Sequence, residues 1–219
     1  MKISILLISI IFTNSILAQV NYENIIINGE VQGKIVEHDS LYLINGFIDK
    51  KYFEIPFYSS EIIYNRFNLK LKLSYPHMYK IAIKSDRGIK PFIAGDYFID
   101  QQTNTIKLNS IPDLNEINGQ NSREYLNDFI PFFENDIEAR KFTGTFYTMR
   151  FNKNPIFDTL LLAYVIKNPD SFVALWNLIL RYTEYGQSDL RDKILENFSA
   201  NMKKNKLWQL LQEDVINIH

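Results

Sequence analysis

The stretch Phe67-Asn68-Leu69-Lys70-Leu71-Lys72-Leu73-Ser74 carries the clearest local pattern in the chain. Apolar residues alternate with polar ones, and this period of two predicts a β-strand with one buried face and one hydrated face. Pro76 interrupts the run, and Tyr79, Ile81 and Ile83 resume the alternation against lysines. The region therefore predicts two consecutive half-buried strands.

Strand patterns extend outward from this stretch, from Ile25 to about Leu108. Turn signals separate the short apolar runs at Asn45-Gly46, Asp86-Arg87-Gly88 and Ala94-Gly95-Asp96. No pattern of helical length lies between the runs, so the crossover helices that a parallel sheet would need do not fit. About seven or eight short strands of this kind predict an antiparallel β-sandwich or an open barrel.

The hydrophobic period becomes helical after Pro112. Asn121-Ser122 predicts the start of a helix, which Pro131 would kink or restart. Asn154-Pro155 predicts a further helix over 156–167, because proline suits the first helical position.

Three more helices are expected towards the C-terminus. Asp170 or Ser171 should cap a helix that ends near Tyr185, and Ser188 should start a short one. Residues 202–218 predict a last amphipathic helix. The sequence thus indicates an α+β fold, with an antiparallel β-sandwich or open barrel over 19–110 and a helical bundle over 111–219.

Residues 1–18 have the pattern of an export signal. Lys2 precedes an apolar segment over 3–12, and Ala18 offers a small residue for cleavage before Gln19. The apolar segment is shorter than the roughly 20 residues of a spanning helix, so we expect no stable membrane span after cleavage. A retained N-terminal anchor is the alternative. The predicted location is the periplasm or the cell envelope.

The composition narrows the classes of function. The chain has no cysteine, which excludes disulfides and a thiol nucleophile of its own. A formal net charge of −1 gives no field strong enough to hold nucleic acid. The 46 % of hydrophobic residues suffices for a sizeable core. We expect no cofactor, and the composition does not indicate the oligomeric state.

No catalytic constellation emerges from the motifs. The chain lacks G-x-S-x-G and H-E-x-x-H, and its histidines, His38, His77 and His219, are expected in exposed loops. Acidic residues group in two places and are expected on hydrated surfaces: Glu134, Asp136 and Glu138, and also Asp113 and Glu116. We therefore assign no catalytic, cofactor-binding or metal-binding residue and expect a protein that is not an enzyme.

Two apolar features allow two interpretations each. The stripe over 202–218 is expected to pack back on Trp176 and its neighbours, although it could dock a partner helix. The aromatic residues of the first strands favour packing in the sheet core over a ligand groove. They are Tyr42, Phe47, Tyr52, Phe53, Phe57 and Tyr58.

Several short stretches follow one another in a recognisable order. They are residues 65–69 (NRFNL) before Tyr75-Pro76, 91–97 (PFIAGDY), 117–122 (INGQNS), 165–172 (VIKNPDSF) and 198–211. This order resembles the N-terminal region of secreted thioredoxin-like thiol–disulfide oxidoreductases of Gram-negative envelopes. In that family a β-sandwich domain of unknown function and a helical linker precede the thioredoxin fold.

The resemblance implies that a catalytic domain with a C-x-x-C dithiol would begin after Asn217, so no residue here inherits the redox role. We expect an exported, non-catalytic binding or interaction module whose partner is a thioredoxin-like or another envelope protein. The alternative is the docking half of an oxidoreductase whose catalytic domain is truncated or separately encoded. A third hypothesis, an exported hydrolase, needs two buried acids in one cleft, and the sequence indicates no such pair.

Overall fold

The computed structural model describes residues 25–32, 40–84, 92–100, 103–108, 116–143 and 145–217. The export signal predicted over residues 1–18 lies outside these ranges. So do His38, His219, Asp113 and the turn at 86–88.

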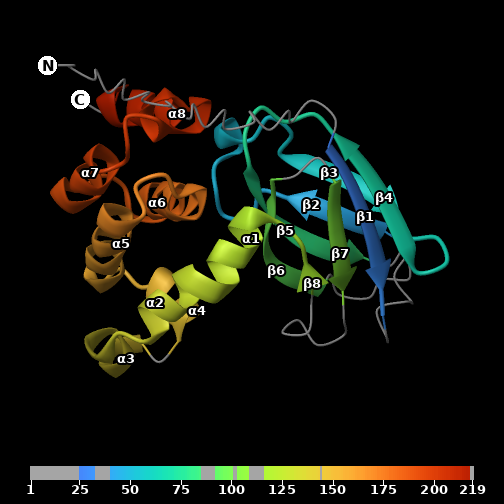
Figure 1. Cartoon of the computed structure of the whole chain (residues 1–219), viewed down its shortest axis with the longest axis horizontal. Coiled ribbons are helices and arrows are strands. Elements are labelled where there is room, and N and C mark those ends of the chain that lie inside the picture. The colour runs from blue at the N-terminus through green and yellow to red at the C-terminus, as the bar shows by residue number, and fades with distance from the viewer. Residues whose placement is uncertain are drawn as a thin grey trace, which may run out of the picture.

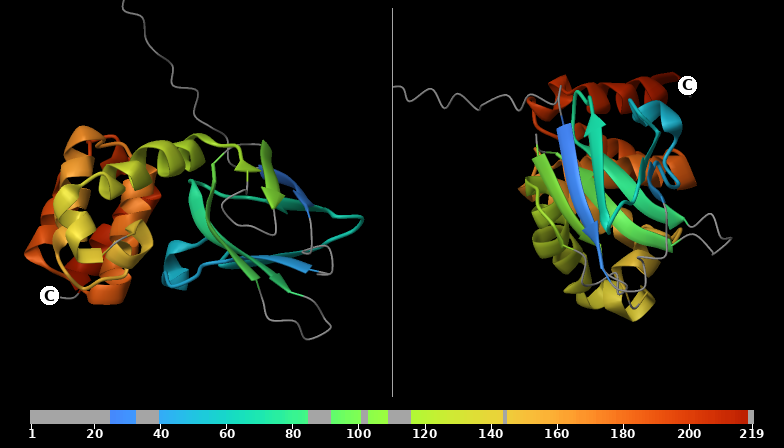
Figure 2. Two further views of the ribbon diagram at one scale, coloured as in Figure 1. Left: turned by 90° about the horizontal axis from the view of Figure 1, so that it is seen from below. Right: turned by 90° about the vertical axis from the view of Figure 1, so that its right-hand side faces the viewer.

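Two four-stranded sheets pack face to face in the N-terminal part (Figure 1). Sheet 1 has the strand order β4-β1-β7-β8, and sheet 2 has the order β3-β2-β5-β6. Figure 2 shows the sheets as two layers, with the helices gathered at one end. The strands are β1 (Ile25–Val31), β2 (Ser40–Ile44), β3 (Phe57–Glu61), β4 (Arg66–Leu71), β5 (His77–Lys84), β6 (Phe92–Ile99), β7 (Thr103–Leu108) and β8 (Glu116–Ile117).

The alternating stretch that begins at Phe67 forms most of β4, where Phe67, Leu69 and Leu71 are buried and their polar neighbours are exposed. In β5, Ile81 and Ile83 are fully buried. The alternating pattern therefore predicted the buried face of both strands. The hydrated face is confirmed for β4 but wrong for β5, where Met78 and Ala82 are also buried and Met78 lies against Arg150.

One strand pair departs from the expected antiparallel order, since β1 and β7 run parallel. All the other paired strands in the described ranges are antiparallel. The prediction excluded parallel pairing for want of a crossover helix. It is wrong for this pair because the chain between β1 and β7 crosses over through the strands of sheet 2. The α+β fold class is confirmed.

The C-terminal part is helical from Gln120 onward (Figure 1). Ser171 and Ser188 cap α6 and α7 as predicted, each accepting a hydrogen bond from a backbone N–H of the first turn. The elements are α1 (Gln120–Glu124), η5 (Tyr125–Phe129), α2 (Ile130–Glu134), α3 (Ile137–Thr143), α4 (Phe146–Arg150), α5 (Ile156–Lys167), α6 (Phe172–Tyr185), α7 (Asp189–Glu196), η6 (Met202–Lys204) and α8 (Lys206–Asn217).

Pro131 produces the predicted restart through a π-helical turn. α1 continues into the π-turn η5, and α2 begins at Ile130 with Pro131 in its first turn. Proline cannot donate a backbone hydrogen bond and its ring collides with the preceding turn of an α-helix. The wider π-turn provides room for this ring.

The sheets and helices share one contiguous hydrophobic core. Trp176 of α6 is fully buried, its Nε1–H donates to the Pro76 carbonyl at 2.9 Å, and its ring lies 4.9 Å from that of Phe53. A short 3-10 helix, η3 (Lys50–Tyr52), carries Tyr52 into the same core.

The apolar stripe of the last helix is packed rather than presented. Leu207, Leu211 and Val215 of α8 are buried in the core that also holds Trp176. Met202 lies in the separate turn η6, so the helix begins later than predicted, at Lys206. Ile218, at the other end of the predicted stripe, lies outside the described residues. Within the described ranges, none of the helices combines the length and the hydropathy needed to cross a bilayer.

Candidate functional site

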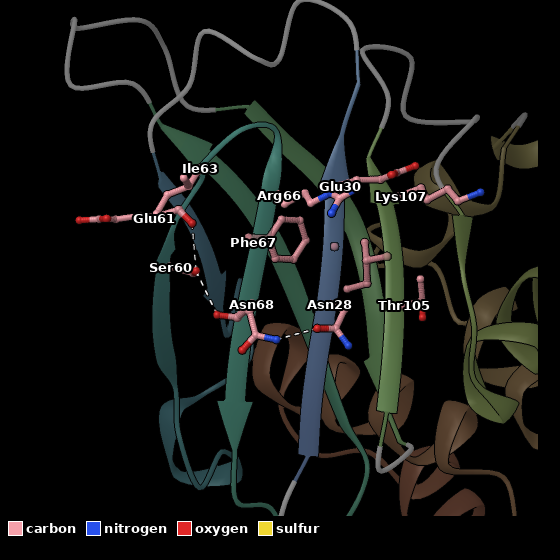
Figure 3. Close-up of a pocket in the computed structure, with 12 residues that line it drawn as sticks. Asn28, Glu30, Ser60, Glu61, Ile63, Arg66, Phe67, Asn68, Thr105 and Lys107 are labelled. Atoms are coloured by element: carbon pink, nitrogen blue, oxygen red, sulfur yellow. Dashed lines mark hydrogen bonds between the residues drawn. The ribbon is translucent and has the colours of Figure 1, made fainter.

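The outer face of sheet 1 carries a hollow of about 830 Å³. Figure 3 shows its side chains coming from β4, β1 and β7, with the end of β3 and the β3–β4 turn along one side. The lining residues are Asn28, Gly29, Glu30, Ser60, Glu61, Ile63, Arg66, Phe67, Asn68, Thr105, Ile106 and Lys107. We call this the sheet-1 hollow.

Strand register places the polar side chains of the hollow in two rows (Figure 3). Asn28 of β1 stands between Asn68 of β4 and Thr105 of β7. The next row outward holds Glu30 between its own neighbours in register, Arg66 and Lys107. Both rows point away from the core because residues two apart on a strand share a face.

The amide row is partly connected within itself. Asn68 Nδ2 donates to Asn28 Oδ1 at 2.6 Å. The Nδ2 group of Asn28 and the Oδ1 atom of Asn68 therefore remain as donor and acceptor on an exposed face. Thr105 adds a hydroxyl beside them. This row can hydrogen-bond a polar ligand in both senses.

Gly29 is required beneath the hollow. It pairs with Phe67 across β1 and β4, and a Cβ on Gly29 would overlap the ring of Phe67 at Cζ. The Phe67 ring is buried, so it occupies the space that a side chain at residue 29 would need. A substitution at Gly29 would displace this ring and deform the floor.

A tight two-residue turn forms the rim beside β4. Ile63 and Arg66 exchange backbone hydrogen bonds of 2.9 and 3.0 Å around Tyr64 and Asn65. Both central residues have positive φ, 50° and 62° respectively. The Val31 N–H donates to the Asn65 carbonyl at 2.8 Å, which fastens the turn to β1.

The charges of the hollow balance one another. Arg66 and Lys107 contribute two positive charges, and Glu30 and Glu61 contribute two negative ones. Lys107 also pairs with the exposed Glu116 at 3.0 Å, and this hydrogen bond raises the pKa of Lys107. The hollow therefore has no net charge with which to select a strongly charged ligand.

A second groove of about 800 Å³ lies between the helix from Gln120 to Asn135 and the C-terminal end of α5. Glu124 lines it and accepts hydrogen bonds on Oε1 from the hydroxyls of Tyr164, at 3.0 Å, and Ser171. Burial raises the pKa of Glu124, and the nearby Asp128 carboxylate raises it further. We call this the Glu124 groove; its carboxyl group could exchange a proton with a bound ligand.

The Glu124 groove bears on the hydrolase hypothesis, since it places two acids, Glu124 and Asp128, along one groove. Sequence reasoning missed them, although their spacing of four on a helix was a visible signal. Asp128 is exposed, however, so the two buried acids that the hypothesis required are not both present here.

His77 corrects a prediction, because it is the first residue of β5 and fully buried rather than exposed. Its Nε2 accepts the Glu54 N–H at 3.1 Å, so its Nδ1–H donates to the Tyr75 carbonyl at 2.8 Å. Burial lowers the pKa of His77 to about 4, against the opposing effect of the Tyr75 hydrogen bond. The alternation of Tyr79 and Ile81 extends back to residue 77 and was the available signal.

Asp96 of β6 joins the sheets to the helices through a buried ion pair. Lys80 Nζ lies 2.8 Å from its Oδ1, and the Arg150 guanidinium of α4 donates to its Oδ2. Burial by itself raises the pKa of Asp96, but the two cations more than offset this and lower it to about 2. The charge is neutralised inside the protein and serves the fold.

A second buried charge stands within the helices. Asp158 of α5 lies 2.7 Å from Nε of Arg181 and 3.0 Å from Nη2 of Arg191. All three side chains are at most 7 % exposed, so this cluster offers no ligand access. Across the described ranges, no three histidine, aspartate or glutamate side chains converge as a metal site would require.

The acidic residues expected on hydrated surfaces divide by role. Glu138 is exposed and pairs with Lys141, as expected. Asp136 instead accepts the Ala139 N–H at 2.8 Å, and the half-buried Glu134 accepts the Phe146 N–H at 3.3 Å. These two carboxylates stabilise helix starts.

The aromatic residues of the first strands differ in their burial. Tyr52 and Phe53 are buried, which confirms core packing for them. Phe47 and Phe57 are 61 % and 57 % exposed, so the same expectation is wrong there. Phe57 belongs to the outer face of sheet 2, opposite the hollow.

In comparisons with known proteins, no family model, no curated protein and no solved structure matches the chain.

Proposed function

We propose that this protein is an exported, non-catalytic binding module of the cell envelope, and that the sheet-1 hollow is its ligand site. The observation that carries the proposal is a set of polar side chains, in two rows across three strands, that line an open hollow of about 830 Å³. This volume lies within the range of roughly 300–1,000 Å³ typical of ligand pockets.

The exposed polar side chains of the hollow have little role in holding the fold together. Asn28, Asn68, Thr105 and Arg66 are exposed, and the core beneath them consists of other residues. A row of amides and a hydroxyl with unused hydrogen-bonding groups suits a polar ligand rather than an apolar one. Export, predicted from residues 1–18, would expose the hollow to the polymers and proteins of the envelope.

A panel of polar probes tests the proposal. Uncharged oligosaccharides, acidic oligosaccharides and a zwitterionic hexapeptide are titrated into the purified protein by calorimetry. The Thr105→Trp variant fills the hollow with an indole, and Ser59→Trp places the same side chain on the outer face of sheet 2. We expect a probe whose binding is lost in Thr105→Trp and kept in Ser59→Trp. Equal binding to both variants would refute the site.

The alternative function, a docking half of a thiol–disulfide oxidoreductase, rests on the family resemblance. It predicts a stable complex with a thioredoxin-like envelope protein, which sedimentation of the mixed proteins would detect. Because the sequence contains no cysteine, we expect the protein alone to catalyse no thiol–disulfide exchange in a turnover assay with a model disulfide.

A further inference from the structure

We propose that the ligand of the sheet-1 hollow is an uncharged oligosaccharide, with the aromatic ring of Tyr64 forming an apolar wall at the rim. The inference rests on the proposed function and specifies the chemical class of its ligand. Three observations support it: the backbone of the rim turn, the hydrogen-bonding groups of the floor and the balance of charge.

Tyr64 occupies a backbone position that does not suit it. The turn has two central residues with positive φ, a geometry in which asparagine and glycine are preferred. Asn65 fits this preference, whereas an aromatic residue at φ 50° is unusual. Strained positions of this kind are concentrated at functional sites, where the surroundings hold them in place.

The Tyr64 ring does not compensate for this strain by packing against the fold, since the residue is 95 % exposed. Its neighbour Ile63 is 58 % exposed and lines the hollow. The hydrogen bond from Val31 N–H to the Asn65 carbonyl fixes the turn beside the floor. The rim turn thus carries one apolar lining residue, Ile63, and next to it the exposed Tyr64, which does not itself line the hollow and whose ring would pack on a ligand that extends over the rim.

A sugar ring matches this combination of surfaces. Its C–H face is apolar and packs on aromatic rings, whereas its edge carries hydroxyl groups that both donate and accept hydrogen bonds. The floor offers the Nδ2 donors of Asn28, the Oδ1 acceptor of Asn68 and the Thr105 hydroxyl. A polar peptide would use the floor equally well, but it would not require an aromatic wall.

The charges favour an uncharged sugar over an acidic one. Arg66 and Lys107 are balanced by Glu30 and Glu61 around the hollow. Gln32 Nε2 donates to Glu30 at 3.0 Å, and Lys107 pairs with Glu116. An acidic polymer would meet as much repulsion as attraction, and electrostatic complementarity is what selects a charged partner.

Calorimetric titration of cellohexaose, maltohexaose and tri-N-acetylchitotriose into the purified protein tests the inference. The variant Tyr64→Asn removes the aromatic ring and introduces a residue that tolerates the positive φ of this turn position. Asn65→Gly alters the same turn and keeps the ring, so it is the matched control. For a bound sugar we expect Tyr64→Asn to weaken binding by about fivefold to tenfold, as expected for a lost aromatic contact, and Asn65→Gly to change it less than about twofold.

The outcomes separate the two proposals. Binding of the zwitterionic hexapeptide but of no sugar, sensitive to Thr105→Trp, would overturn the ligand class and leave the binding function standing. Sugar binding that is equal in Tyr64→Asn and the wild type would overturn the role of the rim. If no sugar, acidic oligosaccharide or peptide binds in a manner sensitive to Thr105→Trp, both proposals fail.

Discussion

Polar side chains are buried and paired in the contact between sheets and helices, whereas in the sheet-1 hollow they are exposed and only partly paired. In the contact, the buried Asp96 is paired with Arg150, and the rings of His77 and Trp176 hydrogen-bond to backbone groups. In the hollow, Asn28 and Thr105 are exposed and keep unused donors and acceptors. The first set serves folding, and the second is available to a ligand.

The difference follows from the free energy of burial. A polar group taken out of water must find a partner or the protein loses stability. An exposed group carries no such requirement, so its identity is open to selection for binding. Substitutions in the contact should therefore change stability, whereas substitutions of the exposed polar residues on the floor of the hollow should change ligand affinity with little effect on stability.

Removal of the Asp96 charge should give the largest effect. Asp96→Asn leaves the guanidinium of Arg150, which is 1 % exposed, without a counter-charge, and breaking a buried pair in this way costs about 3–5 kcal/mol. Urea unfolding at neutral pH measures the loss in the free energy of unfolding. A loss below about 1 kcal/mol would contradict this prediction, because it is the size expected for an exposed polar residue. The double variant Asp96→Leu/Arg150→Met should recover part of the loss, because the fully buried charge of Arg150 is removed together with its partner and only the more exposed Lys80 is left unpaired.

Acid should weaken the contact through His77. The pKa of His77 is about 4 in the folded protein, against an ordinary value of 6.5 for a hydrated histidine, so the unfolded chain binds more protons between these values. The contribution of the neutral His77 to the free energy of unfolding is therefore fully present above pH 6.5. It is lost as the pH falls towards 4, and the loss amounts to about 3 kcal/mol.

Denaturant unfolding across this pH range tests the His77 prediction. His77→Gln should flatten the dependence, because an amide can donate to one backbone partner and accept from the other without titrating. An unchanged slope in this variant would show that other groups carry the acid sensitivity. Asp96 adds to the acid sensitivity only at lower pH, because its pKa is about 2 in the folded protein and 3.8 ordinarily. Its contribution to stability is therefore lost only as the pH falls from about 3.8 towards 2.

Relief of the strained rim should stabilise the protein. Tyr64→Asn places a residue that tolerates positive φ at a position where the wild-type ring is exposed, and the gain should be about 1 kcal/mol. Thermal unfolding of both proteins measures it. A destabilised variant would mean that the ring supports the fold, and its role at the rim would need another explanation.

The smallest effect on stability should come from the floor of the hollow. Asn28→Ala removes the amide that Asn68 contacts at 2.6 Å, yet both residues are exposed. We expect the free energy of unfolding to change by no more than about 0.5 kcal/mol. A loss comparable to that of Asp96→Asn would break the distinction between the two regions.

Local signals in the sequence predicted much of the fold. The alternation in β4 and the serines at 171 and 188 act over a few residues, and a single sequence displays them directly. The parallel pairing of β1 with β7 depends on the path of the chain through sheet 2, which no local pattern encodes. Similarly, the burial of His77 depends on α6, which supplies Trp176 from a distant part of the sequence.

The candidate site was beyond sequence reasoning for the same reason. Asn28, Asn68 and Thr105 are neighbours only through strand register, and each alone is an ordinary hydrated strand residue. The rim turn gave no signal either, since Tyr64-Asn65 lacks the glycine that usually marks a two-residue hairpin.

A map of amide chemical shifts is the most direct test of the sheet-1 hollow as a sugar site. Cellohexaose, maltohexaose and tri-N-acetylchitotriose are each titrated into the isotope-labelled protein, and the shifted amides are assigned. We predict shifts in β1, β4 and β7 and in the turn at Tyr64, with the contact around Trp176 unchanged. Shifts centred on the Glu124 groove, or no shifts with any of the sugars, would contradict this prediction.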